Sequence, residues 1–342
     1  MKGLLVALAV VGSLILANEI LTGRLIPGVA ISPYFLQVMC LAGINIILAV
    51  SLNLINGFTG QFSIGHAGFM AIGAYASAYF TVTFGDKLRH SLTFLPATGQ
   101  QSVLLLTGLA IGAFLAAIAG FIVGVPSLRL RGDYLAIVTL GFGEIIRVFI
   151  LNIDAVGGAR GFSGIPKLAN FFWIYAFAAV TILIVYRIVH SSFGRTLIAI
   201  REDEIAAEAM GVHTTRAKVI SFVVSSALAG VAGGLFAHYL MYVHTNSFTF
   251  LKSFEIIIMI VIGGLGSISG SVLGAVLFIS LTEGLRQFAQ YRMILFSLLL
   301  IVIMIVRPQG ILGHKEFVTF LSKRRREIGD APGSTSATTL ED

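Results

Sequence analysis

The sequence predicts an all-α protein that crosses a membrane many times, and its composition carries this prediction. Hydrophobic residues make up 57% of the 342 residues and charged residues only 11%, whereas soluble chains carry about 25% charged residues. The mean hydropathy is +0.95, and 38 glycines are typical of helices that pack closely in lipid. This composition excludes a soluble enzyme, a disordered chain and a nucleic-acid-binding protein.

About ten segments approach the roughly 20 apolar residues that a membrane-spanning helix needs. In chain order they are Leu4–Leu21, Phe35–Ile55, Ala67–Phe84, Val103–Val125, Tyr134–Ile150, Phe171–Val189, Val219–Val243, Phe254–Ile262, Ser271–Leu285 and Met293–Val306. The eighth is too short to cross upright, so we expect a broken helix around Gly263–Gly270. Leu4–Leu21 also resembles a signal peptide, but no clear cleavage site follows it, and we favour an uncleaved span.

Residues 1–314 therefore form one predicted transmembrane domain. Residues 315–342 form a basic and then polar tail, which we expect to be disordered and cytoplasmic. If the N-terminus is cytoplasmic, ten spans return the C-terminus to the same side, and most of the 23 lysines and arginines then lie inside, as membrane proteins prefer. Lys252 is counted here with an outside segment, and Arg147 lies within the fifth span.

The loop 190–218 is expected to contain a short amphipathic helix. Asp203 is a predicted N-cap and Gly211 a predicted C-terminal glycine. An apolar stripe at helical spacing is formed by Ile205, Ala209 and Val212, with Glu204 and Glu208 on another face. The acidic centre disfavours a helix lying on lipid. It leaves packing on the protein's own cytoplasmic face, or docking into a partner's groove.

Charged and polar residues inside the predicted spans are candidates for a transport pathway. Glu144 and Arg147 stand three residues apart and can pair on one helix face. They either meet a zwitterionic substrate or form a structural pair. Asn45, Asn53 and Asn56 either bond a neighbouring helix or line a cavity.

Glycines interrupt the apolar run after the second span at Gly57, Gly60, Gly65 and Gly68. Such a run predicts a tight turn or a helix broken at a cavity, with close packing as the alternative. The glycines at 108/112, 120/124 and 266/270/274 repeat every four residues, which favours helix packing. The histidines lack metal-ligand spacing, and the single cysteine, Cys40, excludes an internal disulfide.

Several motifs resemble one known family. Residues 208–211 read EAMG, 53–75 read NLINGFTGQFSIGHAGFMAIGAY, 263–275 read GGLGSISGSVLGA, 129–134 read RLRGDY and 307–313 read RPQGILG. The first resembles the coupling loop of ABC (ATP-binding cassette) importer permeases. Together they resemble the LivM-type permeases of high-affinity branched-chain amino acid importers, from about Phe35 to Gly313.

This resemblance implies a non-enzymatic transport subunit in a bacterial inner membrane, with both termini cytoplasmic and lipid around it. The implied partners are a homologous LivH-type permease, two ATPase subunits of the LivG and LivF types, and a periplasmic binding protein. The chain itself is expected to bind no cofactor, no metal and no nucleic acid. ATP and Mg would be used by the partner ATPases, because no lysine here follows a glycine as a Walker A motif requires.

The resemblance favours import of leucine, isoleucine and valine. A related importer of urea or short amides is the alternative, followed by an ion-coupled secondary transporter. No residue is expected to be catalytic. The candidates for ATPase coupling are Asp203, Glu204, Ile205, Glu208, Ala209 and Gly211. The candidates for the translocation path or its gate are Asn53, Asn56, Gly57, Gly60, Gly65, His66, Glu144 and Arg147.

Overall fold

The computed structural model describes residues 32–91, 96–128 and 134–286, together with residues 291, 294, 295, 298, 301, 302, 305, 306, 310 and 311. In that part of the chain all regular structure is helical, apart from an isolated bridge between Phe162 and Val243. Seven of the described helical segments are long and apolar enough to cross a membrane. The predicted class, a helical multi-pass membrane protein, is confirmed.

The expected number of about ten spans is only partly covered by these residues. The first predicted span, Leu4–Leu21, lies outside the described residues, and the tenth, Met293–Val306, is described only at scattered positions. The ninth corresponds to a shorter apolar helix, Ile268–Gly284. The predicted tail, 315–342, also lies outside the described residues.

The helices follow the predicted order closely. They are α2 (Pro33–Asn53), extended by the π-helical turn η1 (Leu54–Phe58), α3 (His66–Ser91), α4 (Ala97–Ser127), α5 (Tyr134–Leu151), α6 (Phe171–Val189), α7 (Ser192–Glu202), α8 (Glu204–Ala209), α9 (Thr214–Leu240), α10 (Phe250–Gly263) and α11 (Ile268–Gly284). Short 3₁₀ turns lie at Asp154–Val156, Gly158–Arg160 and Thr245–Phe248.

The eighth predicted span is longer than expected. Phe254–Ile262 was assigned from its continuous apolar run, but α10 begins at Phe250, and the turn Thr245–Phe248 precedes it. Together they form a 19-residue apolar segment. The polar residues in the turn lower the local hydropathy, so the sequence does not reveal that the turn continues into α10.

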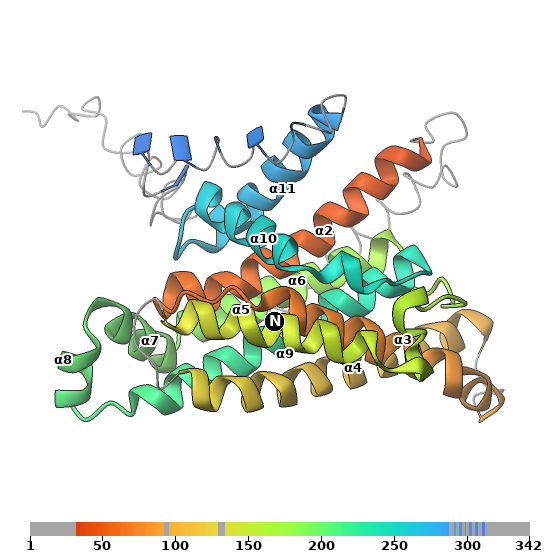
Figure 1. The fold of residues 1–342 in the computed structure, drawn as a ribbon, viewed down its shortest axis with the longest axis horizontal. Coiled ribbons are helices and arrows are strands. Elements are labelled where there is room, and N and C mark those ends of the chain that lie inside the picture. The colour runs from red at the N-terminus through yellow and green to blue at the C-terminus, as the bar shows by residue number, and fades with distance from the viewer. Residues whose placement is uncertain are drawn as a thin grey trace, which may run out of the picture.

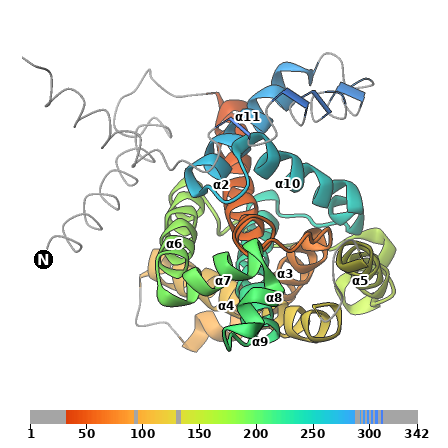
Figure 2. The same ribbon diagram turned by 90° about the vertical axis from the view of Figure 1, so that its left-hand side faces the viewer.

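Helix α2 forms the centre of the bundle. Most of its surface is buried, with 83% of its apolar window inside the protein, as expected of a helix that is apolar on all sides. It contacts α6, α9, α10 and α11. Figure 1 shows α2 crossing the molecule between the α3–α4–α9 layer and the α10–α11 hairpin. In Figure 1, α7 and α8 lie together at the left-hand end, which we call the α8 end; in Figure 2 this end faces the viewer.

The α3–α4–α9 layer is packed through glycines. A Cβ atom on Gly73 would clash with the backbone of Gly230 in α9, and one on Gly233 would clash with the carbonyl oxygen of Met70. A Cβ atom on Gly112 of α4 would lie 2.7 Å from the carbonyl oxygen of Gly73. The helix backbones touch here because small residues allow it, so the four-residue glycine repeat of α4 serves packing at this position.

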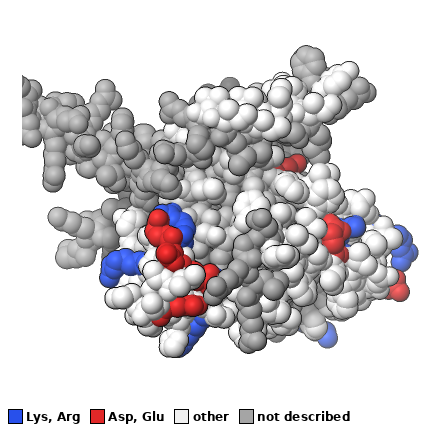
Figure 3. All heavy atoms as spheres, turned by 60° about the vertical axis from the view of Figure 1, so that its left-hand side comes forward, with Lys and Arg blue, Asp and Glu red and all other residues white. Residues whose placement is uncertain are grey.

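The surface of the described residues is apolar between the two ends of the bundle. In Figure 3, acidic and basic side chains gather toward the α8 end and toward the opposite end, and the face between them is mostly uncharged. Aromatic and aliphatic side chains such as Phe114 of α4, Phe149 of α5 and Leu183 of α6 are exposed. This distribution fits a bundle surrounded by lipid.

We predict that Gly73→Ala destabilises the protein, because the added methyl group would force α3 and α9 apart. Overpacking of this kind costs about 1–3 kcal/mol, so the melting temperature in detergent should fall clearly. Gly141→Ala on α5 is the matched control, since nothing lies within 4 Å of its Cβ position and alanine favours helix. Equal melting temperatures for the two variants would contradict the packing argument.

Candidate functional site

The short helix at the α8 end begins and ends as the sequence predicts. The Asp203 carboxylate accepts hydrogen bonds from the backbone N–H groups of Ile205 and Ala206, at 2.9 and 3.0 Å. Gly211 follows the helix with φ +83°, a left-handed conformation that glycine adopts without strain. A strong cap at each end allows a helix as short as Glu204–Ala209 to persist.

The two glutamates of α8 anchor it to the start of α9. Glu204 Oε1 lies 2.6 Å from the ammonium of Lys218, whose side chain is only 6% exposed. The Thr214 hydroxyl donates to Glu208 Oε1 at 2.6 Å. Ala207 is buried between them. Both glutamates therefore have partners within this chain, whereas the sequence alone suggested only an acidic face of the helix.

Anchoring on that side leaves an apolar face of α8 exposed. Ile205 is 67% exposed and Met210 85% exposed, and Ala209 is exposed between them. The predicted stripe is divided, because Val212 lies beyond the helix and packs against the protein's own core. The outward apolar face thus consists of Ile205, Ala209 and Met210.

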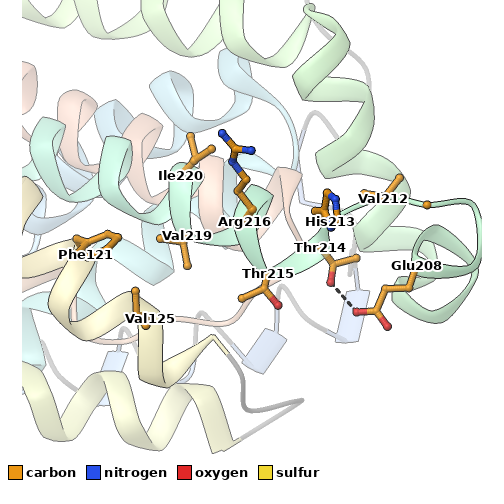
Figure 4. A pocket seen from close by; sticks show the side chains of 11 residues that line it. Phe121, Val125, Glu208, Val212, His213, Thr214, Thr215, Arg216, Val219 and Ile220 are labelled. Carbon is orange, nitrogen blue, oxygen red and sulfur yellow. Dashed lines mark hydrogen bonds between the residues drawn. The ribbon is translucent and has the colours of Figure 1, made fainter.

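A broad groove of about 990 Å³ opens beside this helix. One wall is apolar and comes from Phe121 and Val125 of α4 and from Val219 of α9. Glu208 lies at its rim, and Figure 4 shows the Glu208 side chain turned back toward Thr214. Glu208 and Gly211 both line the groove, so it borders helix α8.

Helix α7 connects this surface to the glycine-rich segment after α2. Nη1 of Arg201 donates to the carbonyl oxygen of Gly57 at 3.1 Å. Gly60, with φ +72°, lies so close that a Cβ atom would be 2.7 Å from Cγ of Arg201. Arg201 also pairs with Glu202 at 2.6 Å. Arg201 is therefore the direct polar contact from α7 to this segment.

Asn53 joins the end of α2 to the turn between α10 and α11. Its Nδ2 donates to the Ser267 carbonyl and the Ser271 hydroxyl at 2.9 and 2.7 Å. Its Oδ1 accepts from the Gly266 N–H at 3.0 Å. Gly57 leaves room for this contact, since a Cβ atom there would clash with Asn53 and with Gly266 N. The two glycine-rich motifs of the sequence thus meet at Asn53.

The remaining candidates in this segment make internal contacts. Asn56 Oδ1 accepts from the Ser63 N–H at 3.2 Å, and Nε2 of His66 lies 2.9 Å from the Ser51 hydroxyl. Gly65 lies against the Thr139 carbonyl, where a side chain would clash. These contacts hold the non-helical stretch between η1 and α3 against α2 and α5.

Glu144 and Arg147 form a pair on α5, at 2.7 Å between Oε2 and Nε. Oε1 of Glu144 also accepts from the backbone N–H of Phe250 at 3.2 Å. That group is one of the first N–H groups of α10, which have no partner inside their own helix. Glu144 therefore joins α5 to the start of α10, a contact that sequence spacing alone does not reveal.

Lys252 lies in helix α10 and not in the outside segment to which the charge count assigned it. It was assigned to an outside segment, but it stands in the first turn of α10, 3.0 Å from Glu255 and 3.2 Å from Oδ1 of Asn45 in α2. The longer α10 explains the difference. The sequence singles out Asn45, but its spacing gives no sign that Lys252 joins it to Glu255.

Comparison with known proteins identifies relatives over most of the chain. A family model described as the permease component of branched-chain amino acid transport systems matches residues 34–306. The chain is 38% identical to the high-affinity branched-chain amino acid transport system permease protein LivM of Salmonella typhimurium strain LT2, over 79% of this chain and 68% of the relative. It is 36% identical to LivM of Escherichia coli K12, over 89% of this chain and 77% of that relative.

A shorter similarity involves a second permease of the same transport system. LivH of Escherichia coli K12 is 32% identical over 166 residues, which cover 47% of this chain and 53% of LivH. No solved structure matches the chain significantly.

We predict that Glu144→Gln destabilises the protein more than the double change Glu144→Gln with Arg147→Gln. The single variant retains an acceptor for Phe250 but leaves the Arg147 charge unpaired, at a cost of about 1–3 kcal/mol. The double variant removes that charge. The measurement is the melting temperature and the yield of folded protein in detergent. A double variant as unstable as the two single variants combined would show that the residues act separately.

Proposed function

The chain belongs to the family of branched-chain amino acid transport permeases, and from this premise we propose that it is one membrane-spanning subunit of an ATP-driven importer of leucine, isoleucine and valine. The proposed coupling to ATP hydrolysis rests on the anchored helix α8, which exposes Ile205, Ala209 and Met210 at one end of the bundle. An exposed apolar face on a short, rigid helix is suited to insertion into a partner's groove.

The partner that we propose for this face is an ATPase subunit. The chain has no Gly-Lys pair with which to form a Walker A motif, so ATP would be bound by other subunits. Two ATPases of the LivG and LivF types would use ATP and Mg, and a periplasmic binding protein would deliver the amino acid. Similarity to LivH supports a homologous permease as the second membrane subunit.

The contacts of α7 and α8 would transmit an ATP-driven movement of the ATPase subunits into the helical bundle. Insertion of α8 would displace the start of α9 through the Glu204–Lys218 pair. Because α7 and α8 are consecutive, Arg201 would move the segment at Gly57, and Asn53 would pass the displacement to the α10–α11 turn. In this scheme Asn53, Gly57 and Gly60 belong to the coupling machinery at the α8 end.

The proposed location is the bacterial inner membrane, with both termini and the α8 end in the cytoplasm. Arg195 and Arg201 lie in α7, and Arg187 and Arg216 flank α7 and α8. This local excess of positive charge favours the cytoplasmic side. The opposite end, with the 3₁₀ turns at residues 154–160, would then face the binding protein.

Ala209→Asp should weaken association with the ATPase subunits and reduce uptake. A carboxylate in the buried apolar contact costs a few kcal/mol, while folding should persist, because Ala209 is exposed in the chain itself. Ala155→Asp, the same change at an exposed position of the opposite end, is the control for co-purification of the ATPases. Normal co-purification and uptake with Ala209→Asp would exclude α8 as the docking element.

The orientation can be tested with single cysteines, because the chain has one cysteine, Cys40, and it is fully buried. Asp86→Cys at the end opposite α8, where the side chain is 90% exposed, should react with a membrane-impermeant maleimide in intact spheroplasts. Arg195→Cys on α7, also exposed, should react only after the membrane is opened. The reverse pattern would refute a cytoplasmic α8 end.

A further inference from the structure

A cavity of about 230 Å³ lies within the bundle, between α2, α10 and α11, with α3 and α9 closing its sides. Four polar side chains reach it: Asn45, Lys252, Glu255 and Thr282. The rest of the wall is apolar and includes Ile44, Met70, Phe236 and Phe278. Pockets for drug-sized molecules are about 300–1,000 Å³, so this one is suited to a small metabolite.

The charged groups lie deep in the bundle. Asn45 stands near the middle of the long helix formed by α2 and η1, and its Oδ1 accepts from the Lys252 ammonium. That ammonium therefore lies level with the middle of this candidate membrane span. Lys252 and Glu255 are only 21% and 24% exposed. Ionisable groups at this depth are costly, and they mark substrate or ion pathways by default.

The arrangement of donors and acceptors is fixed by the helices. Nδ2 of Asn45 donates to the Leu41 carbonyl at 2.9 Å, so its Oδ1 is presented toward Lys252. The Thr282 hydroxyl donates to the Phe278 carbonyl at 2.7 Å, which leaves its oxygen as an acceptor. Lys252 stands in the first turn of α10, where the helix dipole adds positive potential. The cavity thus has one cationic donor, the Lys252 ammonium, with acceptors beside it on Glu255 and Asn45.

An α-amino acid zwitterion is the ligand that this set matches. We infer that the cavity is a transit site for such a zwitterion, with Lys252 binding its carboxylate, and Glu255 and the Asn45 carbonyl oxygen binding its ammonium. The aliphatic side chain lies against the apolar wall. This inference rests on the proposed function and deepens it.

The internal ion pair explains how a zwitterion can enter a low-dielectric site. Lys252 and Glu255 neutralise each other when the cavity is unliganded, and each exchanges its partner for one end of the ligand when the amino acid binds. Each charged side chain therefore has an oppositely charged partner both in the empty and in the liganded cavity, so neither state leaves a buried charge unpaired. When the ligand leaves, the pair closes again, which favours release. Urea and short amides lack both charges and cannot replace either partner.

The decisive experiment uses the complete importer with its binding protein in proteoliposomes, and it measures leucine uptake. Glu255→Gln and Lys252→Met should each lower uptake at least about tenfold, since hydrogen bonds to charged groups contribute about 1.5–3 kcal/mol. Thr107→Val is the control. It removes a part-buried polar group of α4 that bonds to the Val103 and Leu104 carbonyls of its own helix and does not line the cavity, so uptake should stay at the wild-type level.

A charge exchange separates binding from structure. The double variant Lys252→Glu with Glu255→Lys keeps a charge pair and should assemble, because a glutamate in the first turn complements the dipole of α10, but the positions of the two charges in the site are exchanged. We expect normal assembly with uptake still reduced about tenfold or more. Full uptake in this variant, or in the neutral double variant Lys252→Met with Glu255→Gln, would show that the pair is only structural and would overturn the inference.

The outcomes also distinguish this inference from the function on which it rests. A wild-type complex that fails to import branched-chain amino acids would refute the proposed function, whatever the variants do. If every charge variant fails to assemble, Ile279→Phe decides, because it narrows the apolar wall without changing a charge. It should reduce uptake of leucine more than that of valine. Equal reductions, or none, would refute the cavity as the transit site.

Discussion

The structure depends on one constraint: a polar backbone group inside a bilayer needs a partner from the protein, because lipid supplies none. Continuous helices meet this requirement internally, and broken helices do not. The breaks of this bundle lie at the two ends of α10 and after α2. At each break, a side chain supplies a partner for a backbone group. Asn53 closes the α10–α11 turn, Asn56 closes the stretch after η1, and Glu144 accepts from the start of α10.

These closures also determine where the helices are joined by polar contacts rather than by packing alone. Elsewhere glycines bring helix backbones together, as between Gly73 and Gly230, and such contacts resist any relative movement of α3 and α9. A hydrogen bond such as that from Arg201 to Gly57 can lengthen or exchange without opening a void. The α8 end therefore combines a rigid layer with a line of adjustable contacts, which the proposed coupling requires.

Sequence patterns predicted those parts of the protein that follow from local chemistry. Hydropathy located α2 to α6 and α9, and the caps Asp203 and Gly211 followed from their side chains alone. Contacts between distant segments were not predictable. Glu204 and Glu208 were predicted to lie on a separate, acidic face of the helix, but nothing in their spacing indicates Lys218 or Thr214 as their partners. Lys252 was assigned to an outside loop because charge counting treats every residue outside an apolar run as exposed.

The α10–α11 hairpin links the proposed coupling contacts to the cavity. It is held at its turn by Asn53 and at the start of α10 by Asn45 through Lys252, and both asparagines belong to α2. A helix rises about 1.5 Å per residue, so these two contacts act on α10 nearly one helix length apart. A displacement of the turn relative to α2 would tilt α10 and change the spacing between Lys252 and Asn45. The same short helix would thus respond to movement at the α8 end and form the charged wall of the cavity.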